Sequence, residues 1–471
     1  MRAYRLLAAI ILLISLGHPI VPPAAASPAA AAPASVALSA TPAMFTRQQM
    51  EADLRQLTEA ARQSWAYADD KRENDDVDLD AQLADKLGRL DTLKTRDDFY
   101  YLLEEYVAAL HDGHAYVNWD WPSTGLFWPL QLAGTREGIV VSFVAPPAAA
   151  LGVAKGDRLV SVDGQPAEAL QQRLARRLVA STPLARQSGA MSQMERIESG
   201  KAVVLDLTRP NGTAYRVTLP GISYEDFIAV RPAQPPFSLR MLDAATAHLK
   251  IDTFQPEPDK WYQVNTTEER EAILAKTKQT LHGMFAQIAP AKALVLDLRG
   301  NGGGTDMLGE FVAQHLLAAP FIYYFLQQRY SPAMPSYDKP PHTSGWGTKF
   351  PVEVEPDAGI IPFKGRLIVL HDEFSFSTTD NLLSCLKDLH PNATFIGRPS
   401  GGGTGAPREV VTLTHSRAGI SLCTMKVWSP KERLIEGRGT LPDLPVIWTQ
   451  ADVAQGRDPD LEAALKLLKT P

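Results

Sequence analysis

The feature that most constrains the fold is an apolar run that leads directly into consecutive glycines. Residues 294–304 read Leu-Val-Leu-Asp-Leu-Arg-Gly-Asn-Gly-Gly-Gly, and we expect a helix to begin near Asp306. A run this apolar is typical of a strand that is covered on both faces. Glycines permit a tight turn in which backbone N–H groups stay exposed. The segment therefore predicts a strand–turn–helix unit of an α/β fold.

Two kinds of site are compatible with such a turn. A glycine turn at a helix N-terminus attracts anions, so it could bind a nucleotide phosphate. The segment lacks the Lys-Ser/Thr of a P-loop and the spacing of G-x-G-x-x-G. The same N–H groups could instead donate to the oxyanion of a tetrahedral intermediate. We expect Asp297 and Arg299, on the strand entering the turn, to form a buried ion pair that supports the loop.

A second unit of this kind is predicted further along the chain. The apolar run 366–371 is followed by Asp-Glu-Phe-Ser-Phe-Ser-Thr-Thr-Asp and then by a helix expected over 381–389. A serine at such a junction lies near a helix N-terminus, where the dipole favours developing negative charge. Ser377 is the candidate nucleophile and Ser375 is the alternative. In a non-catalytic interpretation, Ser377 and Asp380 form only a capping box.

The remaining pattern divides the chain into regions. Residues 44–122 are expected to form a helical domain: the pattern is helical from Thr46 to about Leu110, where an i, i+3, i+4, i+7 stripe ends at Gly113 as the C-terminal cap, and a strand is expected from His114. Residues 123–222 are β-rich, and 223–471 alternate between strands and helices as an α/β core does. Within these regions we expect strands over 138–143, 203–208, 214–219, 248–253 and 293–299, helices over 167–178 and 268–288, and a partly helical insertion over 181–200.

The N-terminus has the pattern of a secretion signal. Arg2 and Arg5 precede the apolar stretch 6–16, and Ala24-Ala25-Ala26 offers a cleavage site. We therefore expect a signal peptide over 1–26, an Ala/Pro-rich linker over 27–43, and export to the periplasm or the medium. The apolar stretch is too short for a stable membrane span, which needs roughly 20 residues.

Net charge, cysteine content and the absence of metal-binding motifs exclude some partners and cofactors. The net charge is −6 and Lys and Arg are not clustered, so nucleic acid is not an expected partner. Cys385 and Cys423 could pair in an oxidising compartment, but two isolated cysteines are better explained as small buried residues. The chain has no HExxH, CxxC or clustered His/Cys pattern, so we expect neither a catalytic metal nor another cofactor.

These motifs together resemble the tail-specific (carboxyl-terminal processing, S41-type) protease family. The resemblance rests on "DLRGNGGG", on "S-x-S-x-x-D" at the second strand–helix junction, and on the strand His248-Leu-Lys-Ile-Asp-Thr-Phe254. Residues 151–164 also resemble the core of bacterial PDZ domains, although the usual carboxylate-binding loop is not obvious. The resemblance implies a ClpP/crotonase-like ββα spiral as the protease core, a PDZ-like domain that holds peptide ends, and an N-terminal helical cap.

The general base departs from the commonest pattern of that family. Many members use a lysine in the loop after the nucleophile's helix, but Gly403 stands at that position here. A second branch, which resembles tricorn core protease and chlamydial protease-like factor, uses Ser, His and Glu. Its motifs match Asp112-Gly-His114-Ala-Tyr116 and Glu436-Gly-Arg-Gly-Thr-Leu-Pro-Asp443. The resemblance therefore implies Ser377 as nucleophile, His114 as base and Glu436 as the residue that orients the histidine.

Two other histidines are alternatives for the base, and two backbone N–H groups are expected to form the oxyanion hole. His111 and His371 are rival histidines: we expect His111 on the last turn of a helix and His371 within or at the end of a strand. The resemblance implies the backbone N–H groups of Gly303 and Thr378 as the oxyanion hole. The expected function is an exported serine-type endopeptidase that cleaves proteins or peptides. The alternative is a non-catalytic binding protein, for a peptide or a hydrophobic ligand, on the same scaffold.

Overall fold

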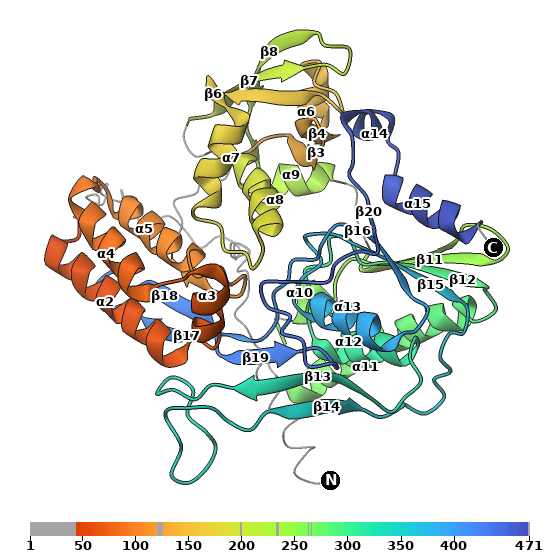
Figure 1. The fold of residues 1–471 in the computed structure, drawn as a ribbon. Coiled ribbons are helices and arrows are strands. Elements are labelled where there is room, and N and C mark those ends of the chain that lie inside the picture. Colours follow the sequence, from red (N-terminus) through yellow and green to blue (C-terminus); the bar gives the residue numbers. More distant parts are fainter. Residues whose placement is uncertain are drawn as a thin grey trace, which may run out of the picture.

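The structure is a computed structural model that describes residues 44–119, 126–197, 200–231, 235–261, 263–264 and 266–469. The predicted signal peptide and linker lie outside these residues. Within the described ranges, no helix combines the length and apolar character needed to cross a membrane. Figure 1 shows a multi-domain α/β chain in which helices from the first hundred residues lie beside a β-rich unit and a large sheet.

The largest sheet positions both strand–turn–helix units. Its order is β10-β11-β12-β15-β16-β20, with β10 antiparallel to β11 and the other pairs parallel. All of β12 is buried, as its apolar sequence predicts. The strands are β10 (Phe237–Met241), β11 (Thr246–Ile251), β12 (Ala293–Asp297), β15 (Arg366–His371), β16 (Thr394–Gly397) and β20 (Leu444–Pro445).

Helices cover both faces of this sheet. Residues Leu294, Leu296 and Val369 pack with α11 (Thr267–Ile288), α12 (Asp306–Gln314) and α13 (Thr378–Leu389) in one apolar cluster. Val295, Ile368 and Leu370, which point the other way, pack with α15 (Pro459–Leu468). The alternation along each strand thus supplies two cores, and both candidate junctions lie where β12 and β15 end.

The N-terminal helices share a core with strands from the far end of the chain. They are α2 (Arg47–Ser64), α3 (Ala68–Asp75), α4 (Leu79–Arg89) and α5 (Arg96–Ala108), with a 3₁₀ turn at Leu90–Thr92. Leu54, Leu103 and Tyr106 pack against Ile420 and Leu422. The short strand β1 (Tyr116–Asn118) pairs with β18 (Gly419–Cys423), which in turn pairs with β17 (Pro407–Thr412). This pairing brings the segment after α5 to the C-terminal half.

The end of α5 differs from the prediction. The helix stops at Ala108, and the residue with the left-handed backbone is His111 (φ 57°) rather than Gly113. His111 therefore lies beyond the helix, not on its last turn. Gly113 has another steric reason to be glycine: a Cβ there would lie 2.7 Å from the Phe376 ring.

The β-rich region forms a separate sheet with its own apolar core. Its strand order is β3-β4-β5-β7-β8, and Trp128, Val141, Leu159 and Leu205 lie in the core. The strands are β3 (Leu130–Thr135), β4 (Gly138–Val144), β5 (Arg158–Val162), β6 (Gln165–Pro166), β7 (Ala202–Thr208) and β8 (Ala214–Pro220). Its helices are α6 (Pro146–Ala150), α7 (Ala167–Ala175) and α8 (Pro183–Met194), and α8 occupies the predicted insertion.

Smaller elements connect these regions. A ribbon of β2 (Leu126–Phe127) and β9 (Ile222–Ser223) precedes α9 (Tyr224–Val230), and α10 (Pro258–Trp261) precedes α11. A three-stranded sheet of β14 (Phe350–Val354), β13 (Phe321–Gln328) and β19 (Met425–Trp428) packs on the core. Helix α14 (Gln450–Gln455) lies beside the β-rich unit (Figure 1). There the Gln450 side chain donates to the carbonyl of Gly156 at 2.8 Å.

Candidate active site

Ser377 stands at the point where the chain turns from β15 into α13. Its backbone has φ 62° and ψ −124°, a conformation that costs a residue with a side chain about 1–3 kcal/mol. Its hydroxyl makes no capping bond to the helix, so the interpretation as a capping box is wrong. The helix begins at Thr378, three residues before the predicted start. The side chain is half-buried and faces the histidine described next.

His114 lies against this serine. Its Nε2 atom is 3.1 Å from Ser377 Oγ, and the ring is buried. The ring also stacks on Phe376, with centroids 4.6 Å apart and planes inclined by 28°. Burial lowers the pKa of His114, and the Asp112 carboxylate opposes that shift. A neutral imidazole at this distance can accept the serine proton.

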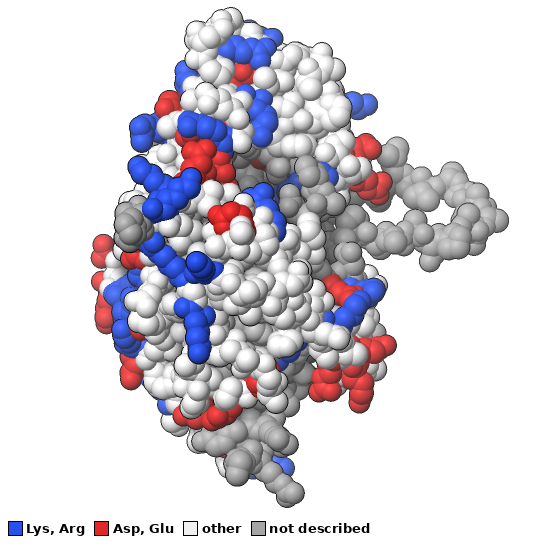
Figure 2. Space-filling view, turned by 90° about the vertical axis from the view of Figure 1, so that its right-hand side faces the viewer, with Lys and Arg blue, Asp and Glu red and all other residues white. Residues whose placement is uncertain are grey.

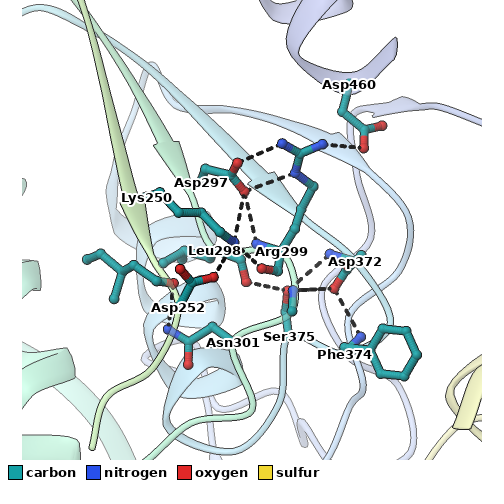
Figure 3. A network of polar contacts seen from close by, with 12 residues as sticks. Lys250, Asp252, Asp297, Leu298, Arg299, Asn301, Asp372, Phe374, Ser375 and Asp460 are labelled. Carbon is teal, nitrogen blue, oxygen red and sulfur yellow. Dashed lines mark hydrogen bonds and ion pairs between the residues drawn. The ribbon is translucent and has the colours of Figure 1, made fainter. Parts of the chain in front are cut away.

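Ser375, the alternative nucleophile, has a structural role. It is fully buried; its hydroxyl donates to the carbonyl of Leu298 at 2.9 Å and accepts from the N–H of Asp372 at 3.0 Å (Figure 3). These bonds tie the turn between β15 and α13 to the segment that enters the glycine turn after β12. A hydroxyl held in this way is turned away from substrate, so the geometry favours Ser377 over Ser375.

Two buried carboxylates approach His114. A ring nitrogen of His114 and carboxylate oxygens of Asp112 and Glu436 all lie within 4.8 Å of one another. Asp112 accepts from the indole of Trp65 at 2.8 Å and from the N–H of His114 at 2.9 Å. Among the described residues, the Nδ1 atom of His114 makes no hydrogen bond, and Glu436 is held by an ion pair of its Oε1 atom with Lys71 at 3.3 Å. Glu436 is thus the carboxylate that is still able to bond the imidazole.

The charge around Glu436 is set by its neighbours. Burial raises its pKa to about 8, and the nearby Asp112 carboxylate adds to the rise. The Lys71 ammonium, 3.3 Å from Oε1, and the Ser181 hydroxyl oppose it. Three such side chains could in principle surround a metal ion, but Lys71 already brings a positive charge to this position.

The glycine turn after β12 lies directly beside Ser377. A Cβ on Gly303 would be 2.7 Å from both the carbonyl of Phe376 and the Cβ of Ser377, and one on Gly304 would be 2.2 Å from the backbone of Phe254. Both positions therefore require glycine. The N–H of Gly303 donates to Asn301 Oδ1 at 2.9 Å, so it already has a partner. Thr378 is the first residue of α13, so its N–H has no acceptor within the helix.

The residue just before this turn anchors it to the C-terminal helix. Arg299 forms ion pairs with Asp297 at 2.6 Å and with Asp460 at 3.0 Å (Figure 3). It also pairs with Asp458 at 2.7 Å. Although burial would raise it, hydrogen bonds from Arg299 and His248 hold the pKa of Asp297 well below its usual range. The predicted supporting ion pair is present, and it extends to α15.

The second glycine loop, residues 400–403, forms a cradle for the Phe376 ring. A Cβ on Gly403 would be 2.1 Å from the Phe376 ring, and one on Gly401 would be 2.8 Å away. Asp380 fixes the loop by accepting from the N–H groups of Gly402 at 2.8 Å and Gly403 at 3.1 Å. Burial raises the pKa of Asp380 to about 7.

The rival histidines lie elsewhere. His371 ends β15, as predicted, and is fully buried beside Phe395; burial lowers its pKa to about 3. His111 has its pKa lowered to about 4 by burial and by Arg186. Both cysteines are buried and free.

Sequence reasoning missed four residues of this site. Asp112 was inside the recognised motif, and Phe376 was inside the Ser-Phe-Ser segment, so both could have been considered. Lys71 lies in the highly charged α3, and Ser181 precedes α8, so neither carried a signal. The distribution of surface charge does not single out a site either. Figure 2 shows that Lys and Arg and Asp and Glu are scattered over the face in view, with broad uncharged areas between them.

Comparison with known proteins gives a family and a fold. Residues 245–446 match the model of peptidase family S41, which agrees with the resemblance to tail-specific proteases. No curated protein matches the sequence. A solved structure of mature CPAF complexed with lactacystin is similar, with a TM-score of 0.70 and 15% identity, covering 90% of this chain and 98% of that one.

Two further structures share the fold. Another structure of mature CPAF has a TM-score of 0.69 and 16% identity, over 90% of this chain and 97% of that one. A putative peptidase from Parabacteroides merdae ATCC 43184 has a TM-score of 0.51 and 17% identity, over 90% and 97% of the respective chains. At these identities the likeness establishes the fold of nearly the whole described chain.

Proposed function

We propose, from the match of residues 245–446 to peptidase family S41, that the chain is an exported serine-type endopeptidase with a Ser-His-Glu mechanism. The observation that supports this most directly is the 3.1 Å approach of His114 Nε2 to Ser377 Oγ. The half-exposed position of Ser377 and the strained backbone that presents it add to that support. Proteins or peptides are the substrate class.

The chemistry follows from these positions. Ser377 Oγ attacks the peptide carbonyl while its proton passes to Nε2 of His114, and His114 then gives that proton to the leaving amine as the C–N bond breaks. Water hydrolyses the resulting acyl-enzyme by the same route in reverse. Glu436 orients the imidazole and stabilises its cation. The N–H groups of Thr378 and Gly303 donate to the oxyanion. For Gly303, the N–H must then leave the Asn301 Oδ1 atom and donate to the substrate oxygen instead.

We propose the finer architecture on the same basis. The β-rich sheet of residues 123–222 acts as a PDZ-like domain that holds a peptide end, residues 44–122 form a helical cap, and residues 223–471 form a crotonase-like protease core. The cap then supplies the base and the core supplies the nucleophile. Export by the segment 1–26 is part of the proposal; it predicts that the mature protein lacks these residues, which N-terminal sequencing of the natural product tests.

A fluorophosphonate probe tests the proposed activity, because it reacts with an activated serine without requiring the natural substrate. We expect wild type to be labelled, Ser377→Ala and His114→Ala to be unlabelled, and Ser375→Ala to keep labelling in proportion to its folded fraction. Folded wild-type protein that resists labelling at every pH from 6 to 10 would contradict the proposal. In that case the binding-protein alternative, tested with peptides and hydrophobic ligands, would take its place.

A further inference from the structure

The buried ammonium of Lys71 is the feature of the site that the proposed mechanism leaves unused. Lys71 lies on α3 and its side chain is only 3% exposed. Its Nζ atom lies 3.3 Å from Glu436 Oε1 and 3.2 Å from Asp75 Oδ2. A lysine is rarely buried unless it is paired, and here one of its two partners is the proposed triad carboxylate.

The backbone next to Glu436 leaves room for the Lys71 ammonium. Gly437, which follows Glu436, has φ 78°, and a Cβ there would lie 2.8 Å from the Lys71 ammonium. Helix α3 is itself held against the site, because Tyr67, the residue at its N-terminal boundary, donates its hydroxyl to the carbonyl of Thr404 at 3.0 Å. The position of the ammonium is therefore built into the fold and does not depend on a flexible surface chain.

We infer that Lys71 is a positioning residue that favours the ionised form of Glu436 and holds it towards His114. The inference rests on the proposed function. Without this ammonium, a carboxylate buried beside the Asp112 carboxylate would keep its proton to a still higher pH, and a protonated Glu436 could not stabilise the imidazolium that forms during proton transfer. Lys71 supplies the one cation that contacts Glu436 among the described residues.

The groups that face Glu436 come from several elements, and all of them enter the charge balance. They are Lys71 and Asp75 from α3, Tyr67 before it, Asp112 and His114 after α5, Ser181 before α8, and Cys423 at the end of β18. Of these, Lys71 is cationic, Asp75 and Asp112 are anionic, and burial keeps Tyr67 and Cys423 neutral by raising their pKa values well above the usual range. Removing the cation should favour protonated Glu436, and removing Asp75 should favour the ionised form.

The rate of fluorophosphonate labelling as a function of pH tests this inference on the full mature chain. In Lys71→Met, which keeps the length of the side chain but not its charge, the half-maximal pH should rise by at least one unit. Labelling at pH 7 should then fall at least tenfold and recover at higher pH. Lys71→Arg should restore a pH profile close to wild type. Lys86→Met is the matched control, because Lys86 is also buried in the helical region but pairs with Asp85.

Asp75→Asn provides a second arm that does not disturb a buried residue, since Asp75 is 34% exposed. It should move the half-maximal pH downward, opposite to Lys71→Met. Wild type that labels normally, with a profile that neither variant shifts, would overturn this inference and leave the proposed function intact. A shift of equal size in Lys86→Met would also overturn it, because a general loosening of the helices would then explain the effect. Failure of wild type to label would overturn the proposed function and this inference with it.

Discussion

His114 Nε2 and Ser377 Oγ lie 3.1 Å apart, although 263 positions separate the two residues in the chain. The contact depends on the pairing of β1 with β18, in which Tyr116 stands opposite Ser421. Because β18 follows the glycine loop that surrounds Phe376, this pairing carries His114 to the nucleophile. Base and nucleophile thus come from opposite ends of the chain, which are joined by this ladder and by the apolar core that the N-terminal helices share with β18.

The pH dependence of the reaction should reflect Glu436. Its pKa is raised to about 8, so the carboxylate that stabilises the imidazolium is lost as the pH falls through about 8. The pKa of His114 is lowered, so loss of the neutral base begins only below its ordinary value near 6.5. We expect the labelling rate of wild type to rise towards a plateau above pH 8.

Glu436→Gln tests this assignment, since glutamine keeps the shape of the side chain but does not titrate. The labelling rate should fall by about 10²- to 10⁴-fold, and the rise near pH 8 should disappear. The remaining activity should decline only below about pH 6.5, where His114 takes up a proton. A variant that still shows the rise near pH 8 would assign that titration to another group.

The backbone strain at Ser377 should be measurable as stability. A φ of 62° with ψ −124° is accessible to glycine and unfavourable for any residue with a Cβ. We expect Ser377→Gly to be about 1 kcal/mol more stable to unfolding than Ser377→Ala, with both variants inactive. Urea denaturation of the two variants makes the comparison, and equal stabilities would indicate that the strain is relieved by local movement.

Substitutions at Phe376 and Gly403 should have coupled effects on stability. The Cβ of alanine at position 403 would lie 2.1 Å from the Phe376 ring, which itself stacks on His114. Gly403→Ala should therefore destabilise the protein by about 1–3 kcal/mol and slow labelling. The cost should shrink in a Phe376→Leu background, and a double-mutant cycle measures the coupling.

A matched control shows that the effect is local to this cradle. Gly283 lies in α11, and a Cβ there would have no neighbouring atom within 4 Å, so Gly283→Ala should be neutral or slightly stabilising. If Gly403→Ala cost the same with Phe376 or leucine at position 376, the ring would not be the reason for glycine at 403.

The sequence predicts those parts of the structure that depend on residues close together in the chain. The buried strand predicted over 293–299 is present and ends at Asp297, two residues early, the helix begins at Asp306 as predicted, and β15 has the predicted bounds of 366–371. Short motifs also predicted Ser377 as the nucleophile and His114 as the base. The contact between them depends on the fold.

What sequence does not predict depends on contacts between distant segments. The left-handed residue after α5 is His111 and not Gly113, because Gly113 is required by Phe376 rather than by the helix end. Lys71 is one charge among many in α3, and only its burial beside Glu436 distinguishes it from a solvated side chain. Such roles follow from the three-dimensional surroundings of a residue, which no pattern in its own segment records.

The ion-pair network of Arg299 should control the stability of the turn that carries Gly303. Arg299 donates to Asp297 from two nitrogens and pairs with Asp460 in the first turn of α15 (Figure 3). It also pairs with Asp458, the residue just before α15. Arg299→Met would leave three carboxylates without their shared cation, and we expect a loss of about 3–5 kcal/mol in the free energy of unfolding. Arg72→Met is the control, because Arg72 is 65% exposed and its pair with Asp69 should contribute under about 1 kcal/mol. Thermal or urea unfolding measures both. A loss for Arg299→Met no larger than that for Arg72→Met would mean that the turn holds its shape without this network.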